Sequence, residues 1–351
     1  MVEKMKDNLR VLETYQVSKD NRSIILDANE NPHNIFEFFL EEFIHEIRMF
    51  PANRYPNTDS EELREHIAKY TDSKKENIIC GNGSDEIIQM VINTFIEKGD
   101  SVVIHTPTFS MYKVFTSIAG GAIVEVLSDE AFRIHPEEII SASNKADAKL
   151  IFLCNPNNPT GFSLSRENII MILENTKATV VVDEAYYEFL DETVVDLTFQ
   201  YERLIVLRTM SKAFALAGAR VGYGVACKET MEMIYKVKPP YNLNSFSQLI
   251  GRLYLKNMPL VKESILKIKQ QRESLLNALS KINELQVFPS AANFVLIRSK
   301  KTPEILQAAN GAGISLRNYG SDPVLGDCLR ITVGTEIENR KLINVIEKVV
   351  G

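Results

Sequence analysis

A lysine among small residues is the first candidate for chemistry. Lys212 lies in the stretch RTMSKAFALAGARVGYG, residues 208–224, where many of its neighbours are alanine, glycine or serine. A lysine that is partly removed from water and close to other cations has a lowered pKa. Its free amine can form a Schiff base with an aldehyde. Arg220 and the hydroxyls of Thr209 and Ser211 would suit a phosphate. The stretch is therefore a candidate site for an aldehyde that carries a phosphate, although a lone lysine is most often simply exposed.

Two further motifs follow strand-like apolar segments. GNGSDE at 81–86 opens a predicted helix, so the backbone of Gly83, Ser84 and Asp85 could bind a phosphate. It is not a dinucleotide fingerprint, because Glu86 stands where the third glycine would be. NPNNPTG at 155–161 predicts a rigid turn from which the amide of Asn158 could donate to a ligand.

A third motif, VVVDEAYYEF at 180–189, places Asp183 and Glu184 at the end of an apolar strand. A buried carboxylate there needs a cationic partner, and a protonated ring nitrogen would be one. Tyr186 could reach the same pocket. Ligands collect at the carboxyl ends of strands in open α/β sheets. The motifs together describe one pocket whose phosphate cradle, amide donor, carboxylate and amine match the groups of pyridoxal 5'-phosphate (PLP), which is the predicted cofactor.

The apolar segments between these motifs predict the elements that position them. Runs rich in valine and isoleucine alternate with helical patterns, which indicates an α/β domain with a mostly parallel, helix-covered sheet of seven strands. After about residue 245, a long charged helical stretch and hairpin-like strands predict a smaller α+β domain. We expect the large domain to comprise residues 46–245. Residues 1–45 and 246–351 would form the small one. The predicted strands are 77–80, 101–105, 122–127, 149–155, 179–185, 203–208 and 221–226; the predicted helices include 60–70, 84–97, 165–175 and 258–282.

Composition excludes several other classes of protein. The chain has 351 residues and a formal net charge of -6, which argues against a nucleic-acid binder. The five histidines show no zinc spacing, so no metal is expected. The four cysteines are scattered and form no C-x-x-C pair, which favours buried thiols in a reducing compartment. No apolar run is long enough to cross a membrane, and the N-terminus does not read as a signal peptide. We expect a cytoplasmic protein.

The motifs NPNNPTG, DEAYYEF and SKAFALAGARVGYG stand in the order seen in the fold-type I PLP-dependent aminotransferases, which the chain resembles over nearly its whole length. It most resembles the histidinol-phosphate aminotransferase branch, through DANENP (27–32), RYPNTDSEELR (54–64), KPPYNLNSFSQ (238–248) and LRITVGT (329–335). The resemblance implies an aspartate-aminotransferase-like fold and a homodimer with composite active sites. It also implies amino transfer between L-histidinol phosphate and 2-oxoglutarate, with glutamate and imidazole acetol phosphate on the other side of the reaction.

The resemblance also assigns roles to cofactor-binding residues. Lys212 would bind PLP covalently and later move the proton between Cα and C4'. Asp183 would pair with the ring nitrogen, and Asn158 and Tyr186 would hydrogen-bond the phenolic oxygen. Phe109 would stack on the ring. The phosphate would be held by Gly83, Ser84, Asp85, Thr209, Ser211 and Arg220, and by Tyr55 of the partner subunit.

On the substrate side the resemblance points to Arg330, Arg317, Tyr15 and Asn29. Arg330 matches the arginine that receives the α-carboxylate of amino-acid substrates. Histidinol phosphate has no carboxylate, so Arg330 and Arg317 would bind its phosphate instead. The segment NENPHN departs from the pattern of the branch on the substrate side.

Three alternatives stay open. An aromatic or broad-specificity aminotransferase would use the same scaffold, because imidazole and phenyl rings fit similar apolar pockets. A phosphothreonine decarboxylase shares the scaffold and a phosphate-bearing substrate. A regulator without catalysis is disfavoured by the presence of Lys212, Asp183, Asn158 and Arg220, and by the lack of an added DNA-binding segment.

Overall fold

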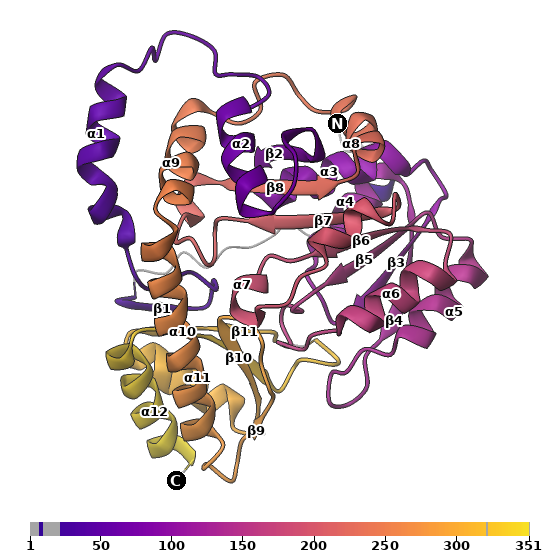
Figure 1. Cartoon of the computed structure of the whole chain (residues 1–351). Coiled ribbons are helices and arrows are strands. Elements are labelled where there is room, and N and C mark those ends of the chain that lie inside the picture. The colour runs from indigo at the N-terminus through magenta and orange to yellow at the C-terminus, as the bar shows by residue number, and fades with distance from the viewer. Residues whose placement is uncertain (1–6, 10–21, 321, 351) are drawn as a thin grey trace.

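The computed structural model describes residues 7–9, 22–320 and 322–350 and contains two β-sheets (Figure 1). The larger sheet has the strand order β2-β8-β7-β6-β5-β3-β4. Strand β8 runs antiparallel to β2 and β7, and the other neighbours are parallel. The predicted mostly parallel sheet of seven strands is therefore confirmed. Its strands are β2 (Ile78–Asn82), β3 (Ser101–Thr106), β4 (Ala122–Leu127), β5 (Leu150–Cys154), β6 (Thr179–Asp183), β7 (Leu204–Thr209) and β8 (Val221–Ala226).

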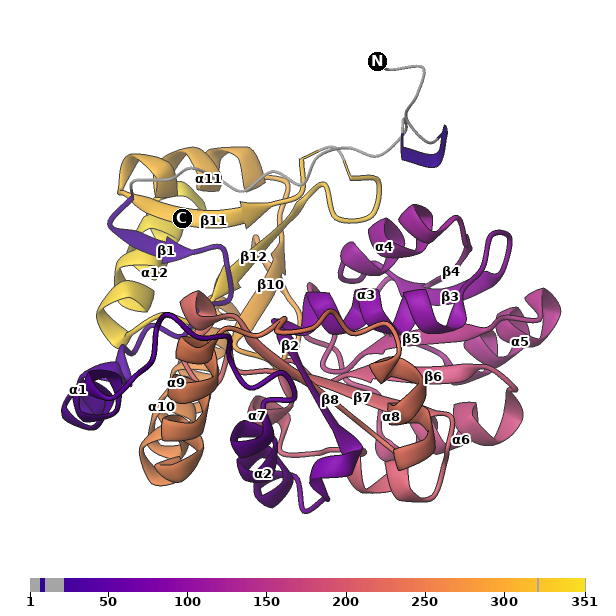
Figure 2. The same cartoon turned by 90° about the horizontal axis from the view of Figure 1, so that it is seen from above.

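Helices cover both faces of this sheet because its strands are apolar on both sides. Val102 and Ile104 belong to one buried cluster, whereas Val103 belongs to the other, as the alternation of side chains along a strand requires. Figure 2 shows α3 and α4 on one side of the sheet and α6 on the other. The first face packs against α3 (Ser84–Phe95), α4 (Met111–Ala119) and α8 (Lys228–Tyr235); the second packs against α2 (Glu61–Tyr70), α5 (Pro136–Ala146) and α6 (Arg166–Asn175).

The smaller sheet has the order β1-β11-β12-β10-β9. Its first strand comes from the N-terminal region and pairs parallel with β11, while the remaining pairs are antiparallel. The boundaries at 45/46 and 245/246 stay a prediction. The elements here are β1 (Ile24–Leu26), β9 (Gln286–Val287), β10 (Phe294–Arg298), β11 (Ile314–Asn318) and β12 (Cys328–Thr332), with α11 (Thr302–Gly311) and α12 (Glu336–Val350) packed together beside them.

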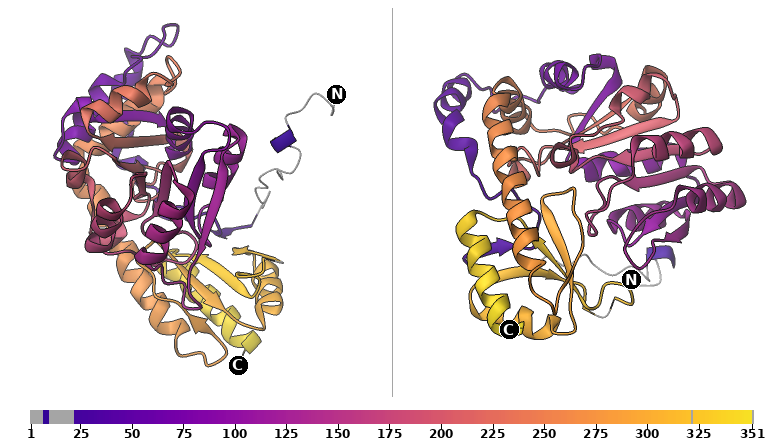
Figure 3. Two further views of the ribbon diagram at one scale, coloured as in Figure 1. Left: turned by 90° about the vertical axis from the view of Figure 1, so that its right-hand side faces the viewer. Right: turned by 60° about the horizontal axis from the view of Figure 1, so that its bottom comes forward.

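Two consecutive helices bridge the sheets. α9 (Ser245–Lys256) contacts α2 and β8, whereas α10 (Met258–Leu279) contacts β10 and α12. The right-hand view of Figure 3 shows this orange helical column running from the larger sheet to the yellow C-terminal region. The remaining helices are α1 (Leu40–Arg48) and α7 (Tyr187–Leu190), with 3-10 turns η2 (Asp7–Leu9), η3 (Ile35–Phe39), η4 (Lys75–Asn77), η5 (Val195–Phe199) and η6 (Ala217–Ala219).

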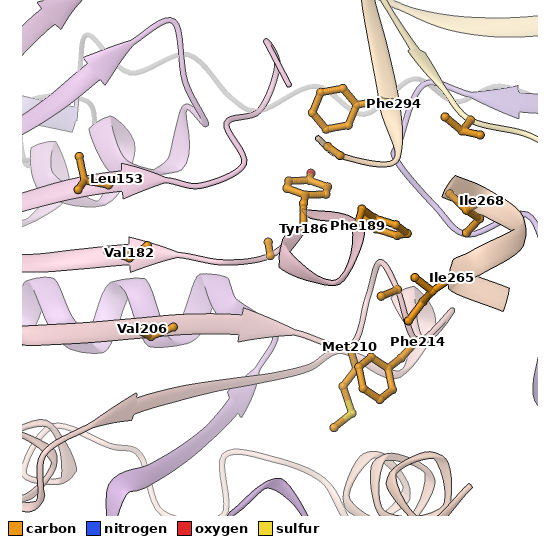
Figure 4. Close-up of a cluster of buried hydrophobic side chains, with 14 of the residues drawn as sticks. Leu153, Val182, Tyr186, Phe189, Val206, Met210, Phe214, Ile265, Ile268 and Phe294 are labelled. Atoms are coloured by element: carbon orange, nitrogen blue, oxygen red, sulfur yellow. The ribbon is translucent and has the colours of Figure 1, made fainter. Parts of the chain in front are cut away.

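One apolar core joins the two parts beside the ends of the central strands. Figure 4 shows Tyr186 and Phe189, just beyond β6, between Phe294 of β10 and Ile265 of α10. The rings of Tyr186 and Phe294 meet edge to face with centroids 5.3 Å apart. This packing fixes the small sheet against the carboxyl ends of the large one. In the described ranges we find no helix with the length and apolar character that crossing a bilayer requires.

Candidate active site

A cavity of about 970 Å³ lies between the two sheets, at the carboxyl ends of β3, β5, β6 and β7. This is the edge at which ligands bind in open α/β sheets. The structure brings most of the predicted site residues to this one cavity. They are Asn29, Ser84, Asp85, Phe109, Asn158, Asp183, Tyr186, Thr209, Ser211, Lys212, Arg220, Arg317 and Arg330.

Three predicted residues are not among those that line the cavity. Gly83 immediately precedes Ser84, which does line it. Tyr55 is 80% exposed and is not among the residues that line the cavity of its own chain. Its ring stacks on Tyr241, with centroids 4.4 Å apart. Tyr15 lies outside the described residues.

Lys212 projects from the turn that follows β7. Its amine donates to the backbone oxygen of Ala28, at 2.9 Å, just beyond β1. Burial, followed by the positive charges of Arg330 and Arg220, lowers the pKa of Lys212 to about 8. An appreciable fraction of this amine is therefore neutral near pH 7–8, as a nucleophile toward an aldehyde must be.

A close backbone approach builds the predicted phosphate cradle. Gly83 has φ +81°, in the left-handed region, and its N–H donates to the carbonyl of Arg220 at 2.8 Å. A Cβ on Gly222 would lie 2.3 Å from the backbone of Gly83 and Ser84. Only glycine lets β8 approach the N-terminus of α3 so closely, and the free N–H groups of that N-terminus favour an anion.

Cationic and hydroxyl side chains line the same cradle. The guanidinium of Arg220 donates to the hydroxyl of Ser211, at 3.4 Å, and to the carboxylate of Asp85, also at 3.4 Å. Thr209 donates to the Ser211 hydroxyl at 2.9 Å. These groups come from α3, the end of β7 and the turn before β8, so the fold brings together residues that are more than a hundred positions apart in sequence.

Asp183 ends β6 with its carboxylate fully buried. The hydroxyl of Tyr112 donates to one oxygen at 2.7 Å, and the N–H of Ala185 donates to the other at 3.1 Å. Both donors are neutral. Burial raises the pKa of Asp183 to about 6, although the two hydrogen bonds act to lower it. A cation beside this carboxylate, such as a protonated ring nitrogen, would stabilise its charged form.

Tyr112 was not predicted from the sequence. It lies three residues after Phe109, in the first turn of α4, and the two rings meet edge to face at 5.6 Å. Its ring also stacks on Phe152 of β5 at 4.8 Å. No local sequence pattern points to it, because its partner Asp183 lies 71 positions further along the chain.

Two side-chain amides, those of Asn158 and Asn29, link the large sheet to the small one. The side-chain oxygen of Asn158 accepts from Arg330 at 2.5 Å. The amide of Asn29 donates to the hydroxyl of Tyr186 at 3.0 Å. Burial raises the pKa of Tyr186 above its ordinary value, so the phenol stays protonated near neutral pH.

A second unpredicted group supports the Asn158 turn from behind. His105 of β3 and the hydroxyl of Thr108 both hydrogen-bond the side-chain oxygen of Asn157, at 3.0 and 2.7 Å. Burial lowers the pKa of His105 to about 4, so its ring is neutral near pH 7. The turn is thereby fixed to β3, and Asn158 is presented to the cavity.

The small sheet contributes two arginines. Arg317 of β11 and Arg330 of β12 are register partners in an antiparallel pair, so their side chains leave the same face of the sheet. Arg330 also donates to the backbone oxygen of Asp27 at 2.5 Å. Its Nε is buried and has no hydrogen-bond partner among the described residues. Two facing guanidiniums and an unused donor favour an anion with more than one negative charge.

Comparisons with known proteins show the family of the chain. The sequence signature of aminotransferase class I and II matches residues 21–346. A protein from Ruminiclostridium cellulolyticum named histidinol-phosphate aminotransferase is 40% identical over 349 residues, which cover 98% of each chain.

Two solved structures share the fold. A histidinol-phosphate aminotransferase from Clostridium acetobutylicum is 29% identical with a TM-score of 0.84, covering 93% of this chain and 98% of that one. One from Sinorhizobium meliloti, in complex with PLP, is 22% identical with a TM-score of 0.87, covering 99% and 97%, and supports the fold alone. The chain therefore belongs to aminotransferase class I and II, the family of PLP-dependent enzymes that its motifs resemble.

Proposed function

We propose that this aminotransferase exchanges an amino group between L-histidinol phosphate and 2-oxoglutarate, and that it serves histidine biosynthesis in the reverse direction. The observation that carries the proposal is the pair Arg317 and Arg330, which are register partners in β11 and β12 and both line the cavity that holds Lys212. The relative from Ruminiclostridium cellulolyticum, which bears the name of this activity, supports it.

The residues present fit PLP as the cofactor. The buried carboxylate of Asp183 has only neutral donors, the glycines of the cradle leave room for a phosphate, and the amine of Lys212 has a lowered pKa. Lys212 would hold the aldehyde carbon, Asp183 the ring nitrogen, and Phe109 would flank the ring. The phenolic oxygen would be hydrogen-bonded by Asn158 and Tyr186, and the phosphate by Gly83, Ser84, Asp85, Thr209, Ser211 and Arg220.

PLP, when bound, supplies an aldehyde that takes up the amino group and a ring that accepts the electron pair of the broken Cα–H bond. The chain supplies the proton transfer. The amine of Lys212 would remove the proton from Cα of the substrate and return it at C4'. Asp183, fixed by Tyr112 and Ala185, would keep the ring nitrogen protonated and so favour the flow of electrons into the ring.

The two arginines would select the substrate by its phosphate. A dianionic phosphate can accept hydrogen bonds from both guanidiniums, whereas the α-carboxylate of glutamate has a single charge for Arg330. Arg330 is held by Asn158 and Asp27, so its orientation is set before the ligand arrives. The deaminated donor leaves before the acceptor binds, so the glutamate pair and the histidinol phosphate pair would use the same cavity in turn.

We further propose a homodimer with composite sites, working in the cytoplasm. Several large apolar side chains are exposed in the single chain around α1 and the start of α9: Phe38, Leu40, Met49, Tyr55, Tyr241 and Phe246. Helix α1 is amphipathic, yet it has no fully buried residue. A second copy of the chain would cover this surface and bring Tyr55 of the partner subunit to the phosphate cradle. The four cysteines are buried and free, in keeping with a reducing compartment.

An assay of both products tests the reaction class. The holoenzyme is incubated with L-histidinol phosphate or O-phospho-L-threonine, with and without 2-oxoglutarate, while glutamate and CO2 are measured. We expect glutamate from histidinol phosphate only when 2-oxoglutarate is present, and no CO2 from either substrate. CO2 release without a keto acid would favour the decarboxylase. Faster amino transfer from phenylalanine or tyrosine than from histidinol phosphate would favour the aromatic alternative.

A further inference from the structure

We infer that Tyr241 is a positioning residue for the phosphate site of the other subunit: it holds Tyr55 at the angle from which that side chain reaches the partner's cofactor. The inference rests on the proposed function, because it takes from it the dimer and the role of Tyr55. It adds a residue that acts only through Tyr55 and that belongs to a different segment of the chain.

The two rings form an exposed stack on the single chain. Their centroids are 4.4 Å apart and their planes are inclined by 16°. Tyr55 is 80% exposed and Tyr241 45% exposed. A side chain with so little cover has several accessible rotamers, and a flat ring stacked on one face removes most of them. A hydroxyl that must meet a phosphate across a subunit boundary needs this restriction.

The backbone of Tyr241 is held in an unfavourable conformation. Its φ is +58°, in the left-handed region that a bulky residue rarely adopts. Such a conformation persists only where the surroundings fix it, and such conformations cluster at functional sites. Two prolines precede Tyr241 in the sequence KPPYN and restrict the chain that leads to it.

Hydrogen bonds fasten the Tyr241 loop, residues 238–242, to the segment that carries Tyr55. The amine of Lys238 donates to the carbonyl of Thr58 at 2.6 Å, and the N–H of Tyr241 donates to the Thr58 hydroxyl at 3.4 Å. Just beyond the loop, Gln248 donates to the carbonyl of Asn57 at 3.1 Å. The stack is therefore part of a cross-linked unit rather than a chance contact of two surface rings.

The same loop is tied to the phosphate cradle of its own subunit. The amide of Asn242 donates to Glu86 at 2.8 Å and to the carbonyl of Cys80 at 3.0 Å. Glu86 in turn accepts from the N–H of Asn82 at 2.6 Å, in the turn that leads into Gly83. Glu86, which stands where a dinucleotide fingerprint has glycine, thus anchors the Tyr241 loop to the cradle.

The test measures the affinity of the apoenzyme for PLP and the 31P resonance of the bound phosphate. Tyr241→Leu keeps apolar bulk on the dimer surface but removes the flat ring, and Tyr241→Phe keeps the ring. Phe246→Leu is the matched control, because Phe246 is similarly exposed but its ring packs at a tilt against Phe50 and not against Tyr55. Sedimentation confirms that each variant is compared as a dimer.

We expect Tyr241→Leu and Tyr55→Phe each to raise the Kd for PLP about tenfold, as for one lost charge-assisted hydrogen bond, and to shift the 31P resonance. The double variant should be no weaker than Tyr55→Phe, while Tyr241→Phe and Phe246→Leu keep the wild-type Kd. If Tyr241→Leu binds PLP like the wild type while Tyr55→Phe is weakened, the inference is overturned and the proposed function stands. If Tyr55→Phe is also unaffected, the role of Tyr55 in the proposed dimer is lost with it.

Mixed dimers distinguish an effect on the partner from one within the same subunit. A subunit with Lys212→Ala and Tyr241→Leu is paired with a wild-type subunit, whose lysine is then the single one able to capture PLP. We expect weakened capture, because Tyr55 comes from the altered subunit. When the two changes are placed on opposite subunits, capture should be normal. The opposite pattern would overturn the inference, since Tyr241 would then act within its own subunit.

Discussion

Arg317 and Arg330 lie directly opposite each other in the β11–β12 pair, so two guanidiniums share one face of the small sheet. Like charges placed across an antiparallel pair repel each other. An anion bound between the two guanidiniums would offset this repulsion. This relationship joins the fold to the choice of substrate, because both arginines also line the cavity that holds Lys212.

Arg317→Ala should therefore impair the phosphate substrate more than glutamate. For histidinol phosphate we expect kcat/KM to fall by a factor that corresponds to about 1.5–3 kcal/mol of lost transition-state stabilisation. This is the range for one lost hydrogen bond to a charged group. The loss with glutamate should be much smaller, since Arg330 remains. Steady-state kinetics with both substrates check this. Equal losses would show that Arg317 does not recognise the phosphate.

Covalent capture of PLP by the apoenzyme should depend on pH with a midpoint near 8. The neutral amine of Lys212 is the reacting form, and its pKa is lowered to about 8 from the ordinary 10.5. The rate of capture should rise as the pH passes through this value and level off above it. Stopped-flow absorbance gives the rate, and borohydride reduction followed by peptide mass analysis locates the adduct. A rate that still climbs steeply near pH 10, or an adduct that survives Lys212→Ala, would contradict the assignment.

Asp183→Asn should stabilise the apoenzyme while it weakens PLP binding. The folded-state pKa of Asp183 is raised from 3.8 to about 6, so the folded state binds more protons than the unfolded state between these values. The contribution of Asp183 to stability is present at low pH and is lost as the pH rises through 6. The variant should gain about 1–3 kcal/mol in unfolding free energy at pH 8, and less at pH 5. Denaturant unfolding at both pH values checks the sign. A variant less stable than the wild type at pH 8 would mean that the surroundings already stabilise the charged carboxylate in the apoenzyme.

Gly222→Ala should damage the phosphate cradle. The added Cβ would lie 2.3 Å from backbone atoms of Gly83 and Ser84, which cannot move aside as a flexible side chain could. The start of α3 must shift, and we expect at least about a tenfold loss of affinity for PLP. Gly218→Ala is the control, because a Cβ there meets nothing within 4 Å. Titration of both apoenzymes with PLP compares them, and equal affinities would show that the close approach has no role in the cradle.

Much of the fold could be predicted from the sequence because its strands are distinct. The runs 122–127 and 221–226 correspond to β4 and β8 with the same bounds, and the predicted helix 165–175 begins one residue later, at Arg166. β8 is buried at every position, and strands buried on both faces give continuous apolar runs that need no tertiary context. β4, at the edge of the sheet, is largely exposed but still shows the valines and isoleucine typical of a strand. The small sheet gave a weaker signal, since β1 and β9 are only three and two residues long.

The cavity residues were predictable where a motif placed them at a strand end. Neighbours brought in by tertiary contact were not. Asp183 and Glu184 look alike in the sequence, yet Asp183 lines the cavity. Glu184 instead pairs with buried Arg208 at 2.8 Å. Tyr112 could be identified only once α4 was seen to bring its hydroxyl to Asp183. Periodicity does not encode which of two adjacent carboxylates faces a ligand.

The most direct test of the account is the half-reaction of the holoenzyme with single amines in the absence of a keto acid. Rapid mixing with L-histidinol phosphate, L-glutamate, L-phenylalanine or O-phospho-L-threonine is followed by the visible absorbance of the bound cofactor. We predict that L-histidinol phosphate has the highest second-order rate constant and that L-phenylalanine reacts at least about tenfold more slowly. A larger rate constant for L-phenylalanine than for L-histidinol phosphate would contradict it.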